Sequence, residues 1–117
     1  MADEDIPSRR RLILGRRRHP RAIVDCIIAL QRLNMPGLMA HALDMSLGGI
    51  RFQCVGFKLA MEELIEVHFS LGENTFTLFG RAVRIRKLDT FSQEIGFAFS
   101  PMTSRNRTLL RNSLYSS

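Results

Sequence analysis

Arginines near the amino end of the chain are the residues best suited to bind a ligand. Fifteen of the seventeen basic residues are arginine, and seven of these fall within residues 9–21. Arginine carries a planar fork of N–H donors, which binds phosphate through paired hydrogen bonds and stacks on flat rings. Pro20 disfavours helix at the residue before it, so we expect an extended segment here. Arg17 and Arg21 would then face the same side, about 13 Å apart at ~3.3 Å per residue.

Two arginine forks facing one way could grip two phosphates, or one phosphate and the O6/N7 edge of a guanine. Taken alone, however, Arg17-x-x-x-Arg21 is a weak pattern, and a generic basic cluster is the more common explanation.

A second group of polar and small residues comprises Asp44, Ser46, Gly48 and Gly49. Asp44 and Ser46 are two residues apart, so in an extended chain their side chains share a face. The carboxylate could accept hydrogen bonds from a guanine, or hold an arginine fork in place. The glycines would let the backbone turn sharply and approach a ligand closely. A tight turn between strands explains the same residues, and it is the simpler interpretation when they are taken alone.

The motifs of common enzyme classes are absent from the sequence. His19, His41 and His68 are far apart and lack clustered cysteine or acidic neighbours, which argues against a metal site. Ser46 does not lie in a G-x-S-x-G nucleophile turn, and there is no Walker loop or G-x-G-x-x-G motif. We therefore predict that the chain is not an enzyme and carries no metal or cofactor.

Alternating and β-branched segments predict a mainly β fold that positions these groups. A parity switch in the longest segment predicts a bulge or bend at Gly80. Thr103 or Ser104 could cap a final helix that places Leu110 and Leu114 on one face. These signals indicate a small antiparallel barrel or sandwich with a carboxyl-terminal helix. The predicted elements are a buried strand at 22–30, strands at 38–43, 50–54, 65–69, 75–87 and 94–99, and a helix ending near 115.

The length of 117 residues fits one domain. Residues 1–15 lack hydrophobic periodicity and read as a flexible basic arm, followed by a folded domain over 16–117. The formal net charge of +6 is concentrated at the amino end. This distribution suggests an anionic partner, but a basic arm without a specific function explains it equally well.

The compartment is predicted from cysteine usage and from the lack of targeting signals. Cys26 and Cys54 lie in apolar surroundings and are expected to be buried thiols in a reducing cytosol. No apolar run reaches the ~20 residues of a membrane span, and no signal peptide is visible. We therefore expect a cytoplasmic protein without membrane insertion.

The two ligand-binding motifs, in this order, resemble those of the PilZ domain, a bacterial receptor for the second messenger cyclic di-GMP. Arg17-x-x-x-Arg21 matches the family's R-x-x-x-R, and Asp44-x-Ser46-x-x-Gly49 matches its [D/N]-x-S-x-x-G. Segments 80–84 and 95–99 look like the closing strands of the family. The resemblance covers about residues 16–100 and implies a six-stranded antiparallel β-barrel with a trailing helix and a flexible amino-terminal arm.

The resemblance also implies a site and a mode of action. The arginine loop would wrap cyclic di-GMP against the barrel, and ligand binding would change the conformation and engage a downstream protein in motility, biofilm formation or polysaccharide synthesis. An arginine before the first motif position, as Arg16 is here, often accompanies an intercalated ligand dimer in this family. The implied ligand-binding residues are Arg16, Arg17, Arg18, Arg21, Asp44, Ser46, Gly48 and Gly49.

Two other functions stay open at this stage. The basic arm alone would suit a nonspecific nucleic-acid binder, and a PilZ-like module could serve only for protein contacts. The sequence also leaves open whether the protein forms a homodimer.

Overall fold

A computed structural model describes residues 12–13 and 19–115 of the chain. Seven strands and one helix follow one another in this part of the chain. The elements are β1 (Leu12–Ile13), β2 (Arg21–Arg32), β3 (Leu38–Met45), β4 (Gly49–Val55), β5 (Leu64–Leu71), β6 (Asn74–Asp89), β7 (Ser92–Phe99) and α1 (Ser104–Tyr115).

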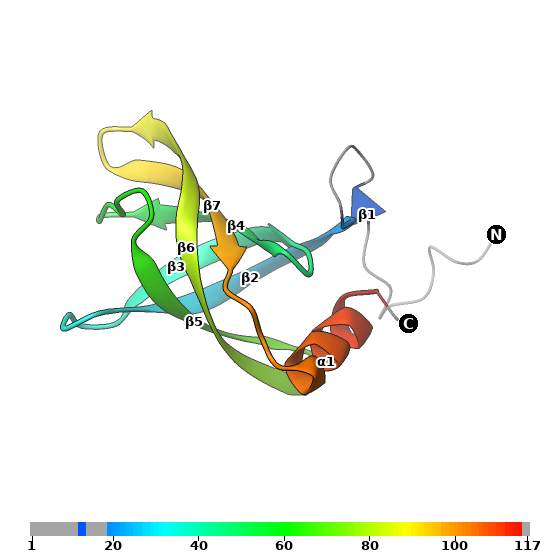
Figure 1. Cartoon of the computed structure of the whole chain (residues 1–117). Coiled ribbons are helices and arrows are strands. Elements are labelled where there is room, and N and C mark those ends of the chain that lie inside the picture. The colour runs from blue at the N-terminus through cyan, green and yellow to red at the C-terminus, as the bar shows by residue number, and fades with distance from the viewer. Residues whose placement is uncertain (1–11, 14–18, 116–117) are drawn as a thin grey trace.

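Six of the strands form a closed antiparallel barrel, as predicted (Figure 1). The strand order is β2-β3-β4-β7-β6-β5, and pairing of β2 with β5 closes the sheet. The two-residue strand β1, which the sequence did not predict, pairs with Arg21 and Ala22 at the start of β2. The rest of the predicted arm at residues 1–15, and its flexibility, lie outside the described residues.

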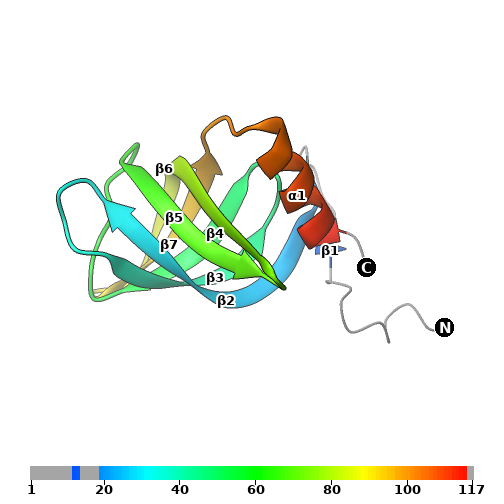
Figure 2. The same ribbon diagram turned by 90° about the horizontal axis from the view of Figure 1, so that it is seen from below.

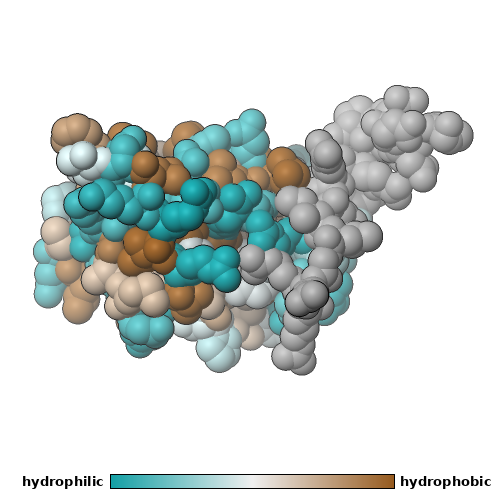
Figure 3. All heavy atoms as spheres, turned by 90° about the horizontal axis from the view of Figure 1, so that it is seen from above, coloured by the Kyte–Doolittle hydropathy of each residue, from teal (hydrophilic) through white to brown (hydrophobic). Residues whose placement is uncertain are grey.

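Alternation of apolar and polar residues builds the core inside the barrel. Ile65, Val67 and Phe69 of β5 point inward, and Ile50 and Phe52 of β4 do the same. The side-chain period of a strand is two, so each strand places one face in the core and one at the surface. On the face shown in Figure 3, hydrophilic residues run in a band between hydrophobic ones, as expected for outward-facing positions.

The first long strand departs from its prediction as a buried segment. Only one face of β2 is buried, and Ile27 is 60% exposed on the other face. The pairing of β2 with β3 shifts between Ile23 and Cys26, and Asp25 there has a φ of 42°. The prediction was wrong because a run of β-branched residues looks the same whether one or both faces are covered.

The predicted bulge at Gly80 is also misplaced. Phe76, Leu78, Gly80 and Ala82 all belong to the buried face, so the alternation continues through Gly80. The register of β6 against β7 shifts two residues later, between Ala82 and Arg84. Gly80 is instead needed for packing, because a Cβ there would lie 2.3 Å from the carbonyl oxygen of Ala98.

Helix α1 lies at one end of the barrel (Figure 2), close to where β2 begins. Of the two candidate capping residues, Thr103 is the cap: its Oγ1 accepts a hydrogen bond from the backbone N–H of Asn106 at 3.1 Å. Leu110 and Leu114 are buried, as their spacing predicted. At the last turn, Tyr115 donates a 2.6 Å hydrogen bond to the carbonyl of Pro20, and this ties the helix to the segment that leads into β2.

The two cysteines are not joined by a disulfide. Cys54 is buried as predicted, whereas Cys26 is only half-buried, which corrects the expectation that both are enclosed. Cys26 is less enclosed because it follows Asp25 at the irregularity in β2, where the backbone register shifts.

Cys54 should react slowly with thiol reagents while the protein is folded. Burial raises the pKa of its thiol to about 12, so almost no nucleophilic thiolate exists near neutral pH. Timed alkylation followed by mass spectrometry should label Cys26 first and Cys54 only after denaturant is added. Equal labelling of both cysteines in the native protein would contradict the buried position.

Candidate functional site

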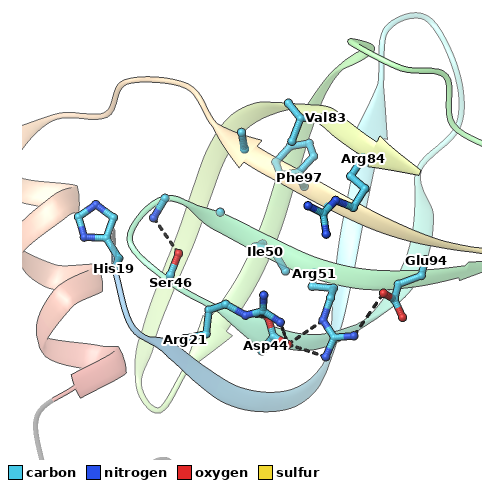
Figure 4. Close-up of a pocket in the computed structure, with 14 residues that line it drawn as sticks. His19, Arg21, Asp44, Ser46, Ile50, Arg51, Val83, Arg84, Glu94 and Phe97 are labelled. Atoms are coloured by element: carbon cyan, nitrogen blue, oxygen red, sulfur yellow. Dashed lines mark hydrogen bonds and ion pairs between the residues drawn. The ribbon is translucent and has the colours of Figure 1, made fainter. Parts of the chain in front are cut away.

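A cavity of about 480 Å³ opens beside the start of β2 and the β3–β4 turn (Figure 4). This volume lies within the range of pockets that hold small molecules. Its wall combines charged groups with small and apolar ones from five strands, so it offers hydrogen bonds as well as flat contact surface. The lining residues are His19, Arg21, Asp44, Ser46, Gly48, Gly49, Ile50, Arg51, Val83, Arg84, Glu94, Gly96, Phe97 and Ala98.

The centre of the site is a buried carboxylate shared by two arginines. Asp44 in β3 is 1% exposed. Arg21 donates from Nη2 to Oδ2 at 2.9 Å, and its Nε lies 2.9 Å from Oδ1 in an ion pair whose direction does not give a hydrogen bond. Arg51 in β4 approaches Oδ2 with Nε at 2.8 Å and Nη2 at 2.7 Å. Asp44 therefore holds both forks in fixed positions.

Register explains why these three residues meet. Arg51 is directly opposite Asp44 in the β3–β4 pairing, and Ile23, two residues beyond Arg21, is opposite Asp44 in β2–β3. Arg21 occupies the first position of β2, so its side chain reaches across the strand end toward the carboxylate.

Glu94 of β7 extends the ion-pair network. Its carboxylate lies 3.3 Å from Nη1 of Arg51 and accepts a 2.9 Å hydrogen bond from Arg86. Burial alone would raise the pKa of Glu94, but the hydrogen bonds from Arg86 and Arg51 outweigh it and hold the pKa below its usual value. Burial would likewise lower the pKa of Arg51, but its bonds to Asp44 and Glu94 raise it instead. Both groups therefore keep their charges near neutral pH.

The β3–β4 turn is built by Ser46 and the two glycines. The Ser46 Oγ accepts a 3.0 Å hydrogen bond from the N–H of Gly48, and the Ser46 N–H donates to the carbonyl of Gly49 at 2.9 Å. A Cβ on Gly49 would lie 1.9 Å from the carbonyl oxygen of Phe97, so β7 requires glycine there. A Cβ on Gly48 would make only ordinary contacts, at 3.6 Å, with the side chains of His19 and Ser46, so packing does not require glycine there.

Five of the eight residues predicted for the site lie together around this one cavity, namely Arg21, Asp44, Ser46, Gly48 and Gly49. Arg16, Arg17 and Arg18 lie outside the described residues. Of the two roles considered for the Asp44 carboxylate, holding an arginine fork is the one formed here.

Sequence reasoning missed Arg51 and Glu94 as cavity residues. Arg51 could have been found, because it lies two residues after Gly49 in a strand that alternates regularly, and the alternation places its side chain on the outer face. Strict alternation from buried Ala82 would place Arg84 inside the barrel, so its position in the cavity wall depends on the register shift between Ala82 and Arg84.

Comparison with known proteins assigns the chain to a family. The model of the PilZ domain matches residues 15–116. The chain belongs to the PilZ family. This confirms the resemblance drawn from the two motifs, and it agrees with the prediction of a non-enzymatic protein, since PilZ domains are receptors. No curated protein sequence matches the chain.

Solved structures of PilZ proteins share the fold. The PilZ domain of YcgR from Escherichia coli, solved with c-di-GMP, has a TM-score of 0.69 at 18% identity, over 86% of this chain and 89% of that one. The K. pneumonia MrkH–c-di-GMP complex also has a TM-score of 0.69, at 16% identity, over 86% of this chain and 50% of that one. For the Bacillus subtilis inhibitor of motility MotI/DgrA the TM-score is 0.65 at 16% identity, over 83% and 48%. The PilZ chain described here thus spans about half the length of MrkH and MotI.

The described part of the PilZ chain offers neither a metal site nor a membrane-spanning helix. Among residues 12–13 and 19–115, no group of three histidine, cysteine or acidic side chains is placed to hold a metal ion. Helix α1 is the one helix in those ranges, and it is not long and apolar enough to cross a membrane.

Proposed function

We propose that the protein is a bacterial receptor for cyclic di-GMP. The observation that carries the proposal is that both sequence motifs contribute to one cavity: Arg21 from the first, and Asp44, Ser46, Gly48 and Gly49 from the second. The YcgR and MrkH structures, which contain c-di-GMP, have the same fold. The proposed site also includes Arg16, Arg17 and Arg18, which precede the cavity residue His19 in the chain.

The hydrogen-bond pattern supports different tasks for the two central arginines in this proposal. Arg51 directs Nε and Nη2 to Asp44 and Nη1 to Glu94, so it is a structural support. Arg21 directs Nε and Nη2 to Asp44 and keeps Nη1 without a partner among the described residues. In this proposal, Nη1 of Arg21 donates to a phosphate or to a guanine edge of the ligand.

The turn residues would contribute in the same way. The Ser46 Oγ already accepts from the N–H of Gly48, so its hydroxyl proton is available for an acceptor on the ligand. Gly48 lines the cavity and has no side chain, so the ligand could approach its backbone closely.

Several finer points belong to the same proposal. Residues 1–15 form an arm and residues 16–117 the receptor domain. Ligand binding orders the arginines and changes the surface offered to an unidentified downstream protein in motility, biofilm formation or polysaccharide synthesis. The ligand binds as an intercalated dimer, the protein acts in the cytoplasm, and a homodimer is compatible with this arrangement.

Titration calorimetry tests the proposal directly. The full chain should bind cyclic di-GMP and discriminate against cyclic di-AMP, because the two ligands share a phosphate ring and differ only in their bases. Binding should weaken only moderately between 50 and 200 mM salt, whereas nonspecific nucleic-acid binding would fall by orders of magnitude. Equal binding of both dinucleotides, or tight salt-sensitive binding of single-stranded DNA alone, would contradict the receptor function.

Arg17→Ala and Arg21→Ala should each weaken cyclic di-GMP binding about 30-fold, equivalent to about 2 kcal/mol. Each change removes charge-assisted hydrogen bonds to an anionic ligand. Arg105→Ala removes the same charge from helix α1 and should leave the dissociation constant unchanged. If all three variants bind equally well, the R-x-x-x-R motif does not hold the ligand.

A further inference from the structure

We propose that Arg84 is a ligand-binding residue outside both sequence motifs, and that its guanidinium pairs with a phosphate of the bound dinucleotide. The inference deepens the proposed receptor function and rests on it. Three observations carry it: the charge balance of the cavity, the bulge in β6, and the residues that flank Arg84.

The charge balance of the cavity singles out Arg84. The lining contains three arginines and two carboxylates among the described residues. Asp44 is paired with Arg21 and Arg51, and Glu94 with Arg51. Arg84 makes no hydrogen bond or ion pair with any described residue. Among the described lining residues, Arg84 therefore supplies a positive charge that no carboxylate of the cavity offsets. Such a charge attracts an anionic ligand.

The bulge in β6 turns Arg84 toward the cavity. Ala82 faces the core, so in a regular strand Val83 would face outward and Arg84 inward. The register shift between Ala82 and Arg84 inserts one extra residue, and both Val83 and Arg84 are consequently exposed on the outer face. Bulges often re-aim side chains beside binding sites. Without this one, a guanidinium would have to enter the apolar core.

The residue opposite Arg84 leaves space for it. Arg84 is paired with Gly96 of β7, and a Cβ on Gly96 would lie 3.1 Å from the Cβ of Arg84. With glycine at this place, the arginine can lie across β7. Figure 4 shows its guanidinium pointing over β7 toward the strand that carries Ile50 and Arg51.

Opposite walls of the cavity therefore present cationic groups to the same space. Arg21 lies at the start of β2 with Nη1 unoccupied by described residues, and Arg84 lies on β6 beyond β7 (Figure 4). A cyclic dinucleotide carries two phosphates on opposite sides of its ring. Two arginines on opposite sides of the cavity suit such a ligand, since each can pair with one phosphate. Val83 beside Arg84 adds an apolar surface for a base.

Charge-matched variants test the assignment. Arg84→Met keeps most of the side chain and removes its charge, Arg84→Lys keeps the charge, and Lys87→Met removes a charge from the same strand outside the cavity wall. Calorimetry with cyclic di-GMP at 0.1 M salt should show binding weakened about 10-fold by Arg84→Met and less by Arg84→Lys, which keeps the charge but loses the paired hydrogen bonds. Lys87→Met should bind within about 3-fold of the unchanged protein. At 1 M salt the loss caused by Arg84→Met should shrink, because screening weakens the charge it removes.

The possible failures are distinguishable. If the unchanged protein binds cyclic di-GMP and Arg84→Met binds it equally well, the role of Arg84 is overturned and the receptor function stands. If Arg84→Met loses as much binding at 1 M salt as at 0.1 M salt, charge is not what Arg84 supplies and the phosphate assignment is overturned. If the unchanged protein does not bind cyclic di-GMP, the receptor function and the inference that rests on it both fail.

Discussion

Replacing Asp44 with alanine should destabilise the fold by about 3 kcal/mol, at the lower end of the range for breaking a buried ion pair. The side chain of Asp44 is 2% exposed, and its loss leaves Arg21 and Arg51 without their shared partner. The lower end applies because the side chain of Arg51 remains 34% exposed, so water can solvate part of it. Urea unfolding monitored by circular dichroism measures the effect.

The same substitution should weaken cyclic di-GMP binding, although it removes a negative charge near an anionic ligand. A purely electrostatic binder would bind more tightly after the change. A preorganised site should bind more weakly, because Arg21 is no longer held in place. Glu73→Ala, in the exposed β5–β6 loop, removes the same charge and should leave binding unchanged. Tighter binding by folded Asp44→Ala would contradict the role of Asp44 as the support of the arginines.

Gly49→Ala should destabilise the protein by about 3 kcal/mol, at the upper end of the usual range for overpacking. The new Cβ would lie 1.9 Å from the carbonyl oxygen of Phe97, and a backbone group cannot move without disturbing the β4–β7 pairing. The measurement is the shift of the urea midpoint relative to the unchanged protein.

Gly48→Ala is the matched control for this change. Its Cβ would meet ordinary contacts at 3.6 Å, so stability should change by less than about 1 kcal/mol. Because Gly48 lines the cavity, the added methyl group should nevertheless weaken ligand binding. Equal destabilisation by the two alanines would show that the glycines share one role, contrary to the packing described here.

The alternation of the strands over one buried face was sufficient to predict an antiparallel barrel or sandwich, and the resemblance of the two motifs to the PilZ family decided for the barrel. Residues 50–54 and 65–69 show this period without interruption, and Leu110 and Leu114 give the helix its buried side. The irregularities at Asp25 and Val83 were not predictable in position. A bulge adds one residue to a strand, and the alternation of inward and outward side chains shifts by one position after it. The position of the bulge depends on the pairing with another strand, so the local sequence does not reveal it.

The candidate site was predictable only where its residues belong to short motifs. Asp44 near the end of β3 and Ser46 in the turn that follows are only two residues apart, so the chain itself brings them to the same cavity. Glu94 and Arg51 come from strands β7 and β4, which pair only in the folded barrel, so no local pattern connects them. The fixed position of the arginines depends on this tertiary pairing.

The hydrogen bond from Tyr115 to Pro20 has a spectroscopic consequence. The chain contains one tyrosine and no tryptophan, so its intrinsic fluorescence and its phenol absorbance both originate at Tyr115. That chromophore contacts the carbonyl immediately before Arg21, and burial raises its pKa. The protein thus carries a natural optical label where helix α1 contacts the arginine segment. Rearrangement of that segment will alter the emission of the whole molecule, without an added dye or an engineered residue.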